Sequence, residues 1–287
     1  MFLNNLLAAG VSLDAQSPLV LADGQGDPTW AFFTNSIFVA LLVVGIVLFF
    51  ARRATRKLQL VPTGSQNLFE AIVETLYNGL EGIVGRHMVG KVFGLLATLF
   101  IYILVANWFA LLPGVGSIGW GESTPEGFHV EIPLLRPATA DLNMTLALAL
   151  VFMIFWLYWT FSELGFLGFL DHTFGVKGGL TGGMKYALLL IFLFVGLIEI
   201  VSLAFRPVSL SLRLFGNVFA GENLLVTMIT LGKTLGLPNW AAFLSGVIIP
   251  IPFYFLEILV GVLQAMVFTL LCAVYIQLST THDEGAH

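Results

Sequence analysis

Long apolar runs with few charges inside them decide what class of protein this chain can form. They occupy residues 30–51, 92–112, 141–161, 183–232 and 239–280. Each meets the requirement of about 20 apolar residues for a helix that crosses a bilayer. Of all residues, 58% are apolar and only 10% are charged, whereas a soluble domain carries about 25% charged residues. The sequence therefore predicts an all-α membrane protein with about five membrane helices.

The charges that flank the first run predict its orientation. Acidic residues precede it, and four basic residues follow it within residues 52–57. By the positive-inside rule this basic end lies in the cytoplasm, which places the N-terminus outside and, after five spans, the C-terminus in the cytoplasm. Residues 1–29 are expected to form an exported tail, with a removed leader over residues 1–22 as the alternative. Residues 30–287 are expected to form a single membrane domain.

Residues 65–85 have a different pattern from the membrane spans. Apolar side chains recur at helical spacing, and acidic and polar residues lie between them: Leu68, Ile72, Leu76 and Leu80 form the apolar stripe. A helix with one apolar face and one charged face lies along a membrane surface or against a partner. We therefore predict an interfacial amphipathic helix over this segment.

The last hundred residues predict two unusually long helices. A helix over residues 183–230 would be about 72 Å long at 1.5 Å per residue, against a hydrocarbon core of about 30 Å. It must either turn back inside the membrane or tilt strongly. No cluster of Gly, Pro and Asn marks a reversal, and Pro207 alone more simply kinks a helix. We therefore expect two tilted antiparallel helices joined near residues 235–239, the second of them bent by Pro250 and Pro252.

Charged residues inside these two spans are candidates for function, because each costs several kcal/mol in hydrocarbon unless it meets protein, water or an opposite charge. Glu199, Arg206 and Arg213 recur every seven residues, which places them on one slowly drifting stripe of a helix. Ser209 and Asn217 lie four residues to either side of Arg213 on the same face. They are placed to hydrogen-bond to it or to orient it.

The acidic residues of the two helices are expected in different surroundings from the arginine. Glu222 lies nine residues after Arg213, a rotation of about 180° that turns it away. Glu257 and Gln264 share a face of the last helix at a spacing of seven. Structural explanations remain open for two of these residues. Arg206 could form an ion pair with Glu199 or extend its charged end to the membrane surface. Glu257 could be a neutral acid held by hydrogen bonds.

Arg213 is harder to explain as a structural residue. Arginine stays protonated in proteins, and no carboxylate lies at close spacing on its face of the helix. An unpaired permanent cation in the membrane implies a partner elsewhere, on another chain. Asn107, Asp141 and Asn143 are candidates for lining an outward-facing polar cavity, and satisfied packing residues are the alternative.

Other classes of site find no support in the sequence. The single cysteine, Cys272, excludes a disulfide framework, and the five histidines show no metal-ligand spacing. No nucleophile–base pair and no phosphate-binding loop occur, and the net charge of −5 gives no reason to expect nucleic acid. The sequence therefore predicts no catalytic residue, no metal site and no cofactor.

The stretch PVSLSLRLFGNVFAGE, residues 207–222, closely resembles the signature of the a subunit of F-type ATP synthases, the stator channel protein beside the rotating c-ring. Shorter matches follow in the family's order: PTGSQN at 62–67, Asn107 with LLP at 111–113, DLNMT at 141–145 and QAMVF at 264–268. The resemblance covers nearly the whole chain beyond residue 30.

This resemblance implies a proton-translocating subunit with two offset aqueous half-channels and a fixed arginine between them. Arg213 would face the ring carboxylate, supported by Asn217, with Gln264 nearby. Glu222 would line the half-channel on the exported side. Glu257 stands where many bacterial relatives carry histidine, so two acids would share that path.

Glu199 would belong to the half-channel on the cytoplasmic side. The implied partners are the c-subunit ring, the peripheral-stalk b subunits, the remaining ATP synthase subunits and the lipid bilayer. The implied location is the bacterial cytoplasmic (inner) membrane. ATP chemistry would reside on other subunits, so the chain itself would not be an enzyme.

The rival hypothesis is a stand-alone secondary transporter with an intramembrane ion pair, although no inverted repeat is visible. The sequence leaves H⁺ and Na⁺ open as the coupling ion.

Overall fold

The computed structural model describes residues 34–56, 64–112, 115, 118–124, 127–174 and 183–280, so the tail and possible leader predicted for residues 1–29 lie outside the described residues. The elements are, in chain order, α2 (Asn35–Thr55), α3 (Ser65–Val84), α4 (Arg86–Ala110), β1 (Gly119–Thr124), β2 (Gly127–Pro133), the 3-10 helix η2 (Ala138–Ala140), α5 (Leu142–Phe174), α6 (Gly183–Thr234), α7 (Asn239–Ile248) and α8 (Pro250–Thr280).

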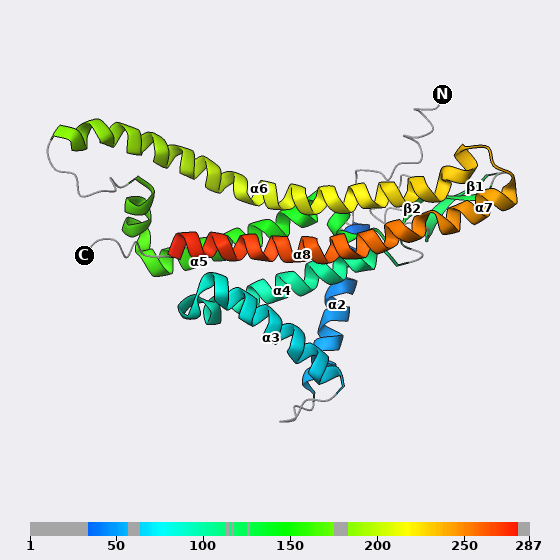
Figure 1. Ribbon diagram of the computed structural model, residues 1–287, viewed down its shortest axis with the longest axis horizontal. Coiled ribbons are helices and arrows are strands. Elements are labelled where there is room, and N and C mark those ends of the chain that lie inside the picture. The colour runs from blue at the N-terminus through cyan, green and yellow to red at the C-terminus, as the bar shows by residue number, and fades with distance from the viewer. Residues whose placement is uncertain are drawn as a thin grey trace, which may run out of the picture.

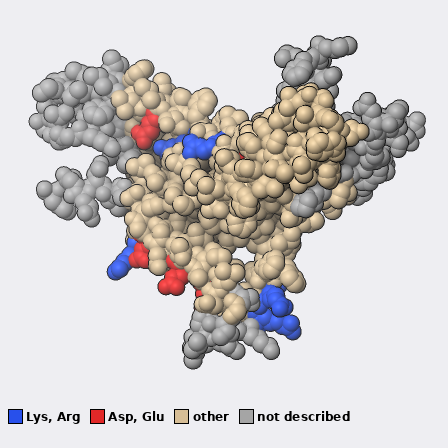
Figure 2. All heavy atoms as spheres, turned by 45° about the vertical axis from the view of Figure 1, so that its right-hand side comes forward, with Lys and Arg blue, Asp and Glu red and all other residues tan. Residues whose placement is uncertain are grey.

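Five helical segments in the described ranges are long and apolar enough to cross a membrane. They are Asn35–Thr55, Arg86–Ala110, Leu142–Leu170, Leu193–Thr234 and Asn239–Thr280. Much of their surface is apolar and exposed. Figure 2 shows broad uncharged areas, with charged side chains along the lower edge of the view and one further group in its upper half. The predicted all-α membrane protein with about five membrane helices is therefore confirmed.

The predicted long antiparallel pair is present as α6 and α7–α8. Helix α6 runs for 52 residues without interruption, with the buried Pro207 inside it. Figure 1 shows α6 alongside α8 and bending away from it toward the N-terminal end of α6. The second member breaks between Ile248 and Pro250, where α7 ends and α8 begins. Proline is tolerated at the start of a helix because its missing N–H has no partner there.

One apolar core joins α3, α4, α5, α6 and α8. Its large and fully buried side chains include Leu96 of α4, Phe152 and Trp156 of α5, Leu214 of α6 and Phe268 of α8. A second, smaller cluster packs α2 against the end of α4. The packing of α5 and α8 against α6 fixes the position of the charged residues that α6 carries.

Helix α3 has the amphipathic character predicted for residues 65–85. Apolar side chains in its last turns are buried, with Leu80 2% and Val84 8% exposed, whereas Leu68 and Ile72 at its beginning are 66% and 40% exposed. The chain turns sharply into α4 at Gly85, whose φ of 83° is a conformation that glycine adopts readily. The exposed apolar half of α3 is the part that a membrane surface or a partner would cover.

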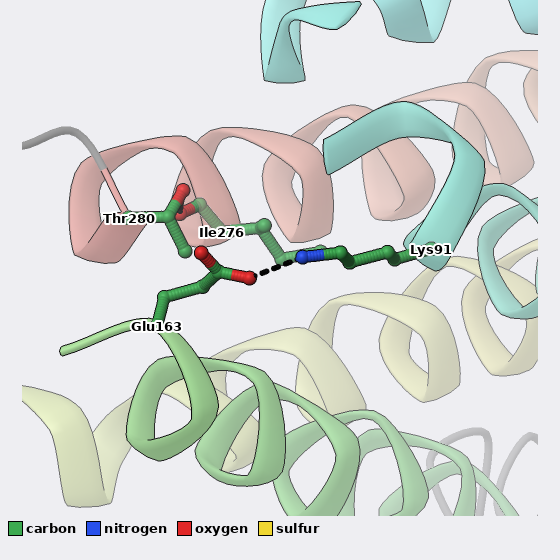
Figure 3. Close-up of polar contacts among 4 residues, drawn as sticks. All are labelled: Lys91, Glu163, Ile276 and Thr280. Atoms are coloured by element: carbon green, nitrogen blue, oxygen red, sulfur yellow. Dashed lines mark hydrogen bonds and ion pairs between the residues drawn. The ribbon is translucent and has the colours of Figure 1, made fainter. Parts of the chain in front are cut away.

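Helix α5 is longer than the span predicted over residues 141–161. It continues to Phe174, with a local break at Gly165, where φ is 70°. The helix continues past the predicted end because glycine readily adopts this positive φ. Glu163 accepts a hydrogen bond of 2.5 Å from Lys91 of α4, beside the C-terminal end of α8 (Figure 3). This ion pair ties α5 to α4 near the last turn of the described chain.

The connection between α4 and α5 contains a β-hairpin that the sequence analysis did not predict. Strands β1 and β2 pair antiparallel, with an irregularity between Trp120 and Gly121. Phe128, Val130 and Ile132 alternate with other residues along β2, and such a period of two favours a strand. The hairpin is tied to α2, because Asn35 donates a hydrogen bond of 2.9 Å to the carbonyl oxygen of Pro133.

Candidate functional site

Helix α6 carries the four charged residues that the sequence analysis singled out, and the structure gives them different surroundings. Glu199, Arg206 and Glu222 are partly buried, whereas Arg213 is exposed. All four lie on one helix without a break, because Pro207 is accommodated inside it. The four charges thus lie along a single helix.

Arg213 points away from the core of the chain. The leucines on either side of it along the inner face, Leu210 and Leu214, are at most 1% exposed, whereas Leu212 is 50% exposed. Within the described residues, Arg213 makes no hydrogen bond and no ion pair. Because arginine does not lose its proton in proteins, the charge persists and is open to an acidic group of another chain.

Asn217, one turn after Arg213, is held by α8. Its side-chain amide donates a hydrogen bond of 2.6 Å to Oε1 of Gln264. Gln264 is 4% exposed, and its Nε2 finds no hydrogen-bond partner in the described part of the chain. Ser209, one turn before Arg213, is exposed and is not hydrogen-bonded to it. The structure therefore joins Asn217 to Gln264 but leaves Ser209 apart from both.

Glu257 of α8 lies against α6 at Gly221, the residue that precedes Glu222 in the chain. The carboxylate of Glu257 packs against the backbone of Gly221, so closely that a Cβ atom at position 221 would overlap it. Oε2 of Glu222, the next residue, is buried and has no hydrogen-bond partner among the described residues. The acid of α8 thus lies against α6 at the level of Gly221 and Glu222, and the absence of a side chain at Gly221 permits this approach.

Arg136 is a functional candidate that the sequence analysis missed. It lies just before η2, is 2% exposed, and donates a hydrogen bond of 3.3 Å to the carbonyl oxygen of Ala140. Its positive charge acts electrostatically on Glu222. The sequence did offer one signal, because Arg136 is the only lysine or arginine between Lys91 and Lys177. Its proximity to Glu222 could not be read from the sequence.

The polar residues at this end of the helices are mostly engaged in local structure. Asp141 is 5% exposed, and its Oδ1 accepts a hydrogen bond of 2.9 Å from the backbone N–H of Asn143. Asn107 is also 5% exposed and donates a hydrogen bond of 3.5 Å to the carbonyl oxygen of Gly261, leaving its own Oδ1 without a partner in the described ranges. Asn143 is exposed. Asn107 therefore fastens α4 to α8 between Glu257 and Gln264.

The guanidinium of Arg206 contacts two aromatic rings and does not form the direct ion pair considered for it. Its guanidinium carbon is 4.5 Å from the ring centre of Tyr275 and 5.6 Å from that of Trp156. Glu199 interacts with it electrostatically, but no direct ion pair joins these two residues. Trp156 and Tyr275 were not predicted to take part, because they come from α5 and α8.

Comparison with known proteins gives a consistent result over most of the chain. The family model described as ATP synthase A chain matches residues 34–277. A relative named ATP synthase subunit a, from Protochlamydia amoebophila, is 33% identical over 90% of this chain and 85% of its own length.

Two other relatives carry the same name. The one from Mycobacterium tuberculosis is 34% identical over 88% of both chains. The one from Moorella thermoacetica is 33% identical over 87% of this chain and 90% of its own length. Since the family model covers most of the residues and the relatives match along nearly their whole length, the chain belongs to the ATP synthase A chain family.

Proposed function

We propose that this chain is the proton-translocating stator subunit of a rotary F-type ATP synthase. The observation that carries the proposal is Arg213, a permanent cation on the exposed face of α6 with no acidic partner in the described part of its own chain. An unpaired charge at membrane depth is costly. The carboxylates of a c-subunit ring would supply the missing partner, each in turn as the ring moves past.

Two aqueous half-channels on opposite sides of Arg213 would complete the proton path. On the exported side we propose Glu222 and Glu257 as the relay, since Gly221 brings them to one level. Asn107, Asp141 and Asn143 would line the entry, and Gln264 would hold Asn217 near the arginine. On the cytoplasmic side the path would contain Glu199, fourteen residues before Arg213 on α6.

The mechanism follows from the fixed charge. A ring carboxylate that reaches Arg213 is stabilised as an anion and releases its proton to one half-channel. It cannot enter lipid while charged, so it must collect a proton from the other half-channel before the ring advances. The arginine also prevents protons from passing directly between the two paths. Each proton that crosses 100 mV supplies about 2.3 kcal/mol.

The proposal includes the partners and the location of the chain. The partners are the c-ring, the peripheral-stalk b subunits, the other ATP synthase subunits and the surrounding lipid. The location is the bacterial cytoplasmic membrane, with the N-terminus outside and the C-terminus in the cytoplasm. The basic residues Arg52 and Arg53 in the last turn of α2 support this orientation. ATP would be made on other subunits, so this chain would act as a non-catalytic channel subunit.

The test is the replacement of Arg213 by alanine in the assembled enzyme. Arg213→Ala should abolish proton-driven ATP synthesis in membrane vesicles, while the complex still assembles. Lys233→Ala is the matched control, because Lys233 is also an exposed basic residue of α6. Normal coupling in Arg213→Ala would contradict the proposal.

Purification separates the proposal from a stand-alone secondary transporter. The stator subunit should co-purify with a small hairpin protein that forms a ring, and by itself it should not perform coupled transport in liposomes. Ion transport by the purified chain alone would favour the transporter.

A further inference from the structure

A pair of buried hydroxyl groups joins α5 to α6 close to Arg213. The side-chain oxygen atoms of Thr145 on α5 and Ser211 on α6 lie 3.0 Å apart, within hydrogen-bonding distance. Thr145 is 0% exposed and Ser211 is 1% exposed. Other inward positions of the two helices, such as Phe152 and Leu214, belong to the apolar core. A hydroxyl buried in such surroundings needs a hydrogen-bond partner, and this contact supplies one.

The direction of this hydrogen bond follows from a second contact of Thr145. The Thr145 hydroxyl lies 3.1 Å from the carbonyl oxygen of Leu142, and a carbonyl oxygen can only accept. Because a hydroxyl carries one proton, Thr145 donates it to Leu142, and the Thr145 oxygen accepts the proton of Ser211. The hydrogen bond from α6 therefore ends on the first turn of α5.

The first turn of α5 is itself held in place. Oδ1 of Asp141 accepts a hydrogen bond of 2.9 Å from the backbone N–H of Asn143. The carbonyl oxygen of Asp141 accepts another, of 3.1 Å, from the backbone N–H of Thr145. All residues of the preceding helix η2 are at most 1% exposed, and η2 packs against α2, α4, α5 and α6. Thr145 thus gives α6 a firm point of attachment.

Ser211 lies on the opposite side of α6 from Arg213. A step of two residues rotates the helix by about 200°, and Ser211 is buried, whereas Arg213 is exposed. Ser211 shares the inner face of α6 with Leu210 and Leu214. The leucines hold this face by apolar contact, which has no preferred direction, whereas a hydrogen bond weakens steeply as its angle worsens. The hydroxyl pair is therefore the contact that resists a small rotation of α6.

We propose that Thr145 is a positioning residue for Arg213: its hydrogen bond with Ser211 fixes the rotation of α6 about its axis and so directs the guanidinium toward the passing ring carboxylates. A helix with its side chains is about 10–12 Å wide, so a rotation of about 20° moves its outer edge by about 2 Å. A misplacement of about 1 Å can slow a step that depends on close approach by about 100-fold. The inference rests on the proposed function, since it takes the contact between Arg213 and the ring as the step that needs alignment.

The test compares stability with coupling in variants of the assembled enzyme. Ser211→Ala removes the hydrogen bond but leaves the Thr145 hydroxyl donating to Leu142, and Thr145→Val combined with Ser211→Ala removes both hydroxyls. Neither change strands a buried donor, so the temperature at which the complex dissociates should stay close to that of the wild type. ATP synthesis by membrane vesicles should nevertheless fall by about fivefold or more in both, because Arg213 is no longer aligned.

A purely structural hydroxyl pair would give the opposite order of effects. Only Thr145→Val alone, which leaves the Ser211 hydroxyl without its acceptor, would then be impaired, and the variant without both hydroxyls would be normal. The exchanged pair, Thr145→Ser with Ser211→Thr, keeps both hydroxyls and should retain most of the ATP synthesis.

A second buried pair provides the matched control. The hydroxyl of Thr160 on α5 donates a hydrogen bond of 3.2 Å to that of Ser279 on α8, so Thr160→Val with Ser279→Ala makes the same chemical change without touching α6. This control should synthesise ATP at close to the wild-type rate. An equal loss in this control would overturn the inference.

Wild-type ATP synthesis in Ser211→Ala and in the variant without both hydroxyls would also overturn it, as would an exchanged pair no better than that variant. If the variant without both hydroxyls does not assemble, Ser211→Ala decides the question. These results are distinguishable from failure of the proposed function, which would appear as normal coupling in Arg213→Ala.

Discussion

Replacing Gly221 by alanine tests whether Glu257 acts from its position against α6. A methyl group at 221 would overlap the Glu257 carboxylate, so the flexible acid must move while the helix backbone stays in place. Holding a side chain away from its preferred rotamer costs about 0.5–1.5 kcal/mol. Because about 1.4 kcal/mol corresponds to a factor of ten, the original carboxylate position should be populated about 2- to 12-fold less.

The assay is ATP-driven acidification of inverted membrane vesicles, followed with a quenched fluorescent dye. Gly221→Ala should slow acidification by about 2- to 12-fold without reducing the amount of assembled complex. Alanine is favoured over glycine inside a helix by about 1 kcal/mol, which offsets the strain. Gly94→Ala is the control, because a Cβ at this helical position meets nothing within 4 Å.

A second background shows whether the effect passes through Glu257. When Glu257→Ala has already removed the carboxylate, adding Gly221→Ala should cause no further loss. Wild-type acidification in Gly221→Ala, or an equal additional loss in the Glu257→Ala background, would refute the reasoning.

Three further predictions concern pairs of residues. Glu222→Gln and Glu257→Gln together should slow proton entry far more than either alone, measured as a double-mutant cycle, and mild additive effects would argue against a shared path. The Asn217–Gln264 hydrogen bond is tested by changing each residue to leucine. Either single variant leaves the other amide without its partner and should destabilise the complex by about 1–3 kcal/mol, measured by thermal dissociation. The double leucine variant should lose less than the sum, and strict additivity would contradict the hydrogen bond. Lys91→Met removes the ion pair with Glu163 and should lower the stability of the complex by at most about 1 kcal/mol, because the Lys91 side chain is 49% exposed. Proton pumping should stay normal in this variant. Loss of coupling between pumping and ATP hydrolysis would show that the ion pair is not purely structural.

Patterns along one helix were predictable from the sequence. The length of the apolar runs indicated two long antiparallel helices, which α6 and α8 confirm. The spacing of nine residues indicated that Glu222 and Arg213 face different surroundings. In the structure the Glu222 side chain is partly buried, whereas the Arg213 side chain is exposed. Both conclusions need only helix geometry and the width of a bilayer.

Contacts between distant segments could not be predicted in the same way. Trp156 and Tyr275 are far apart in the chain, yet the rings of both contact the guanidinium of Arg206. Arg136 approaches Glu222 from the connection before α5. The break in α5 at Gly165 depends on one residue with positive φ, after which the helix continues beyond the span predicted over residues 141–161. Each of these features is set by tertiary packing, which local periodicity does not encode.

The most direct test of the central claim is a density map of the assembly extracted in detergent, at a resolution that shows side chains. The account predicts that the Arg213 guanidinium faces a carboxylate of a ring subunit across the exposed side of α6. An acid of the same chain paired with Arg213, or lipid with no acid opposite it, would contradict the account.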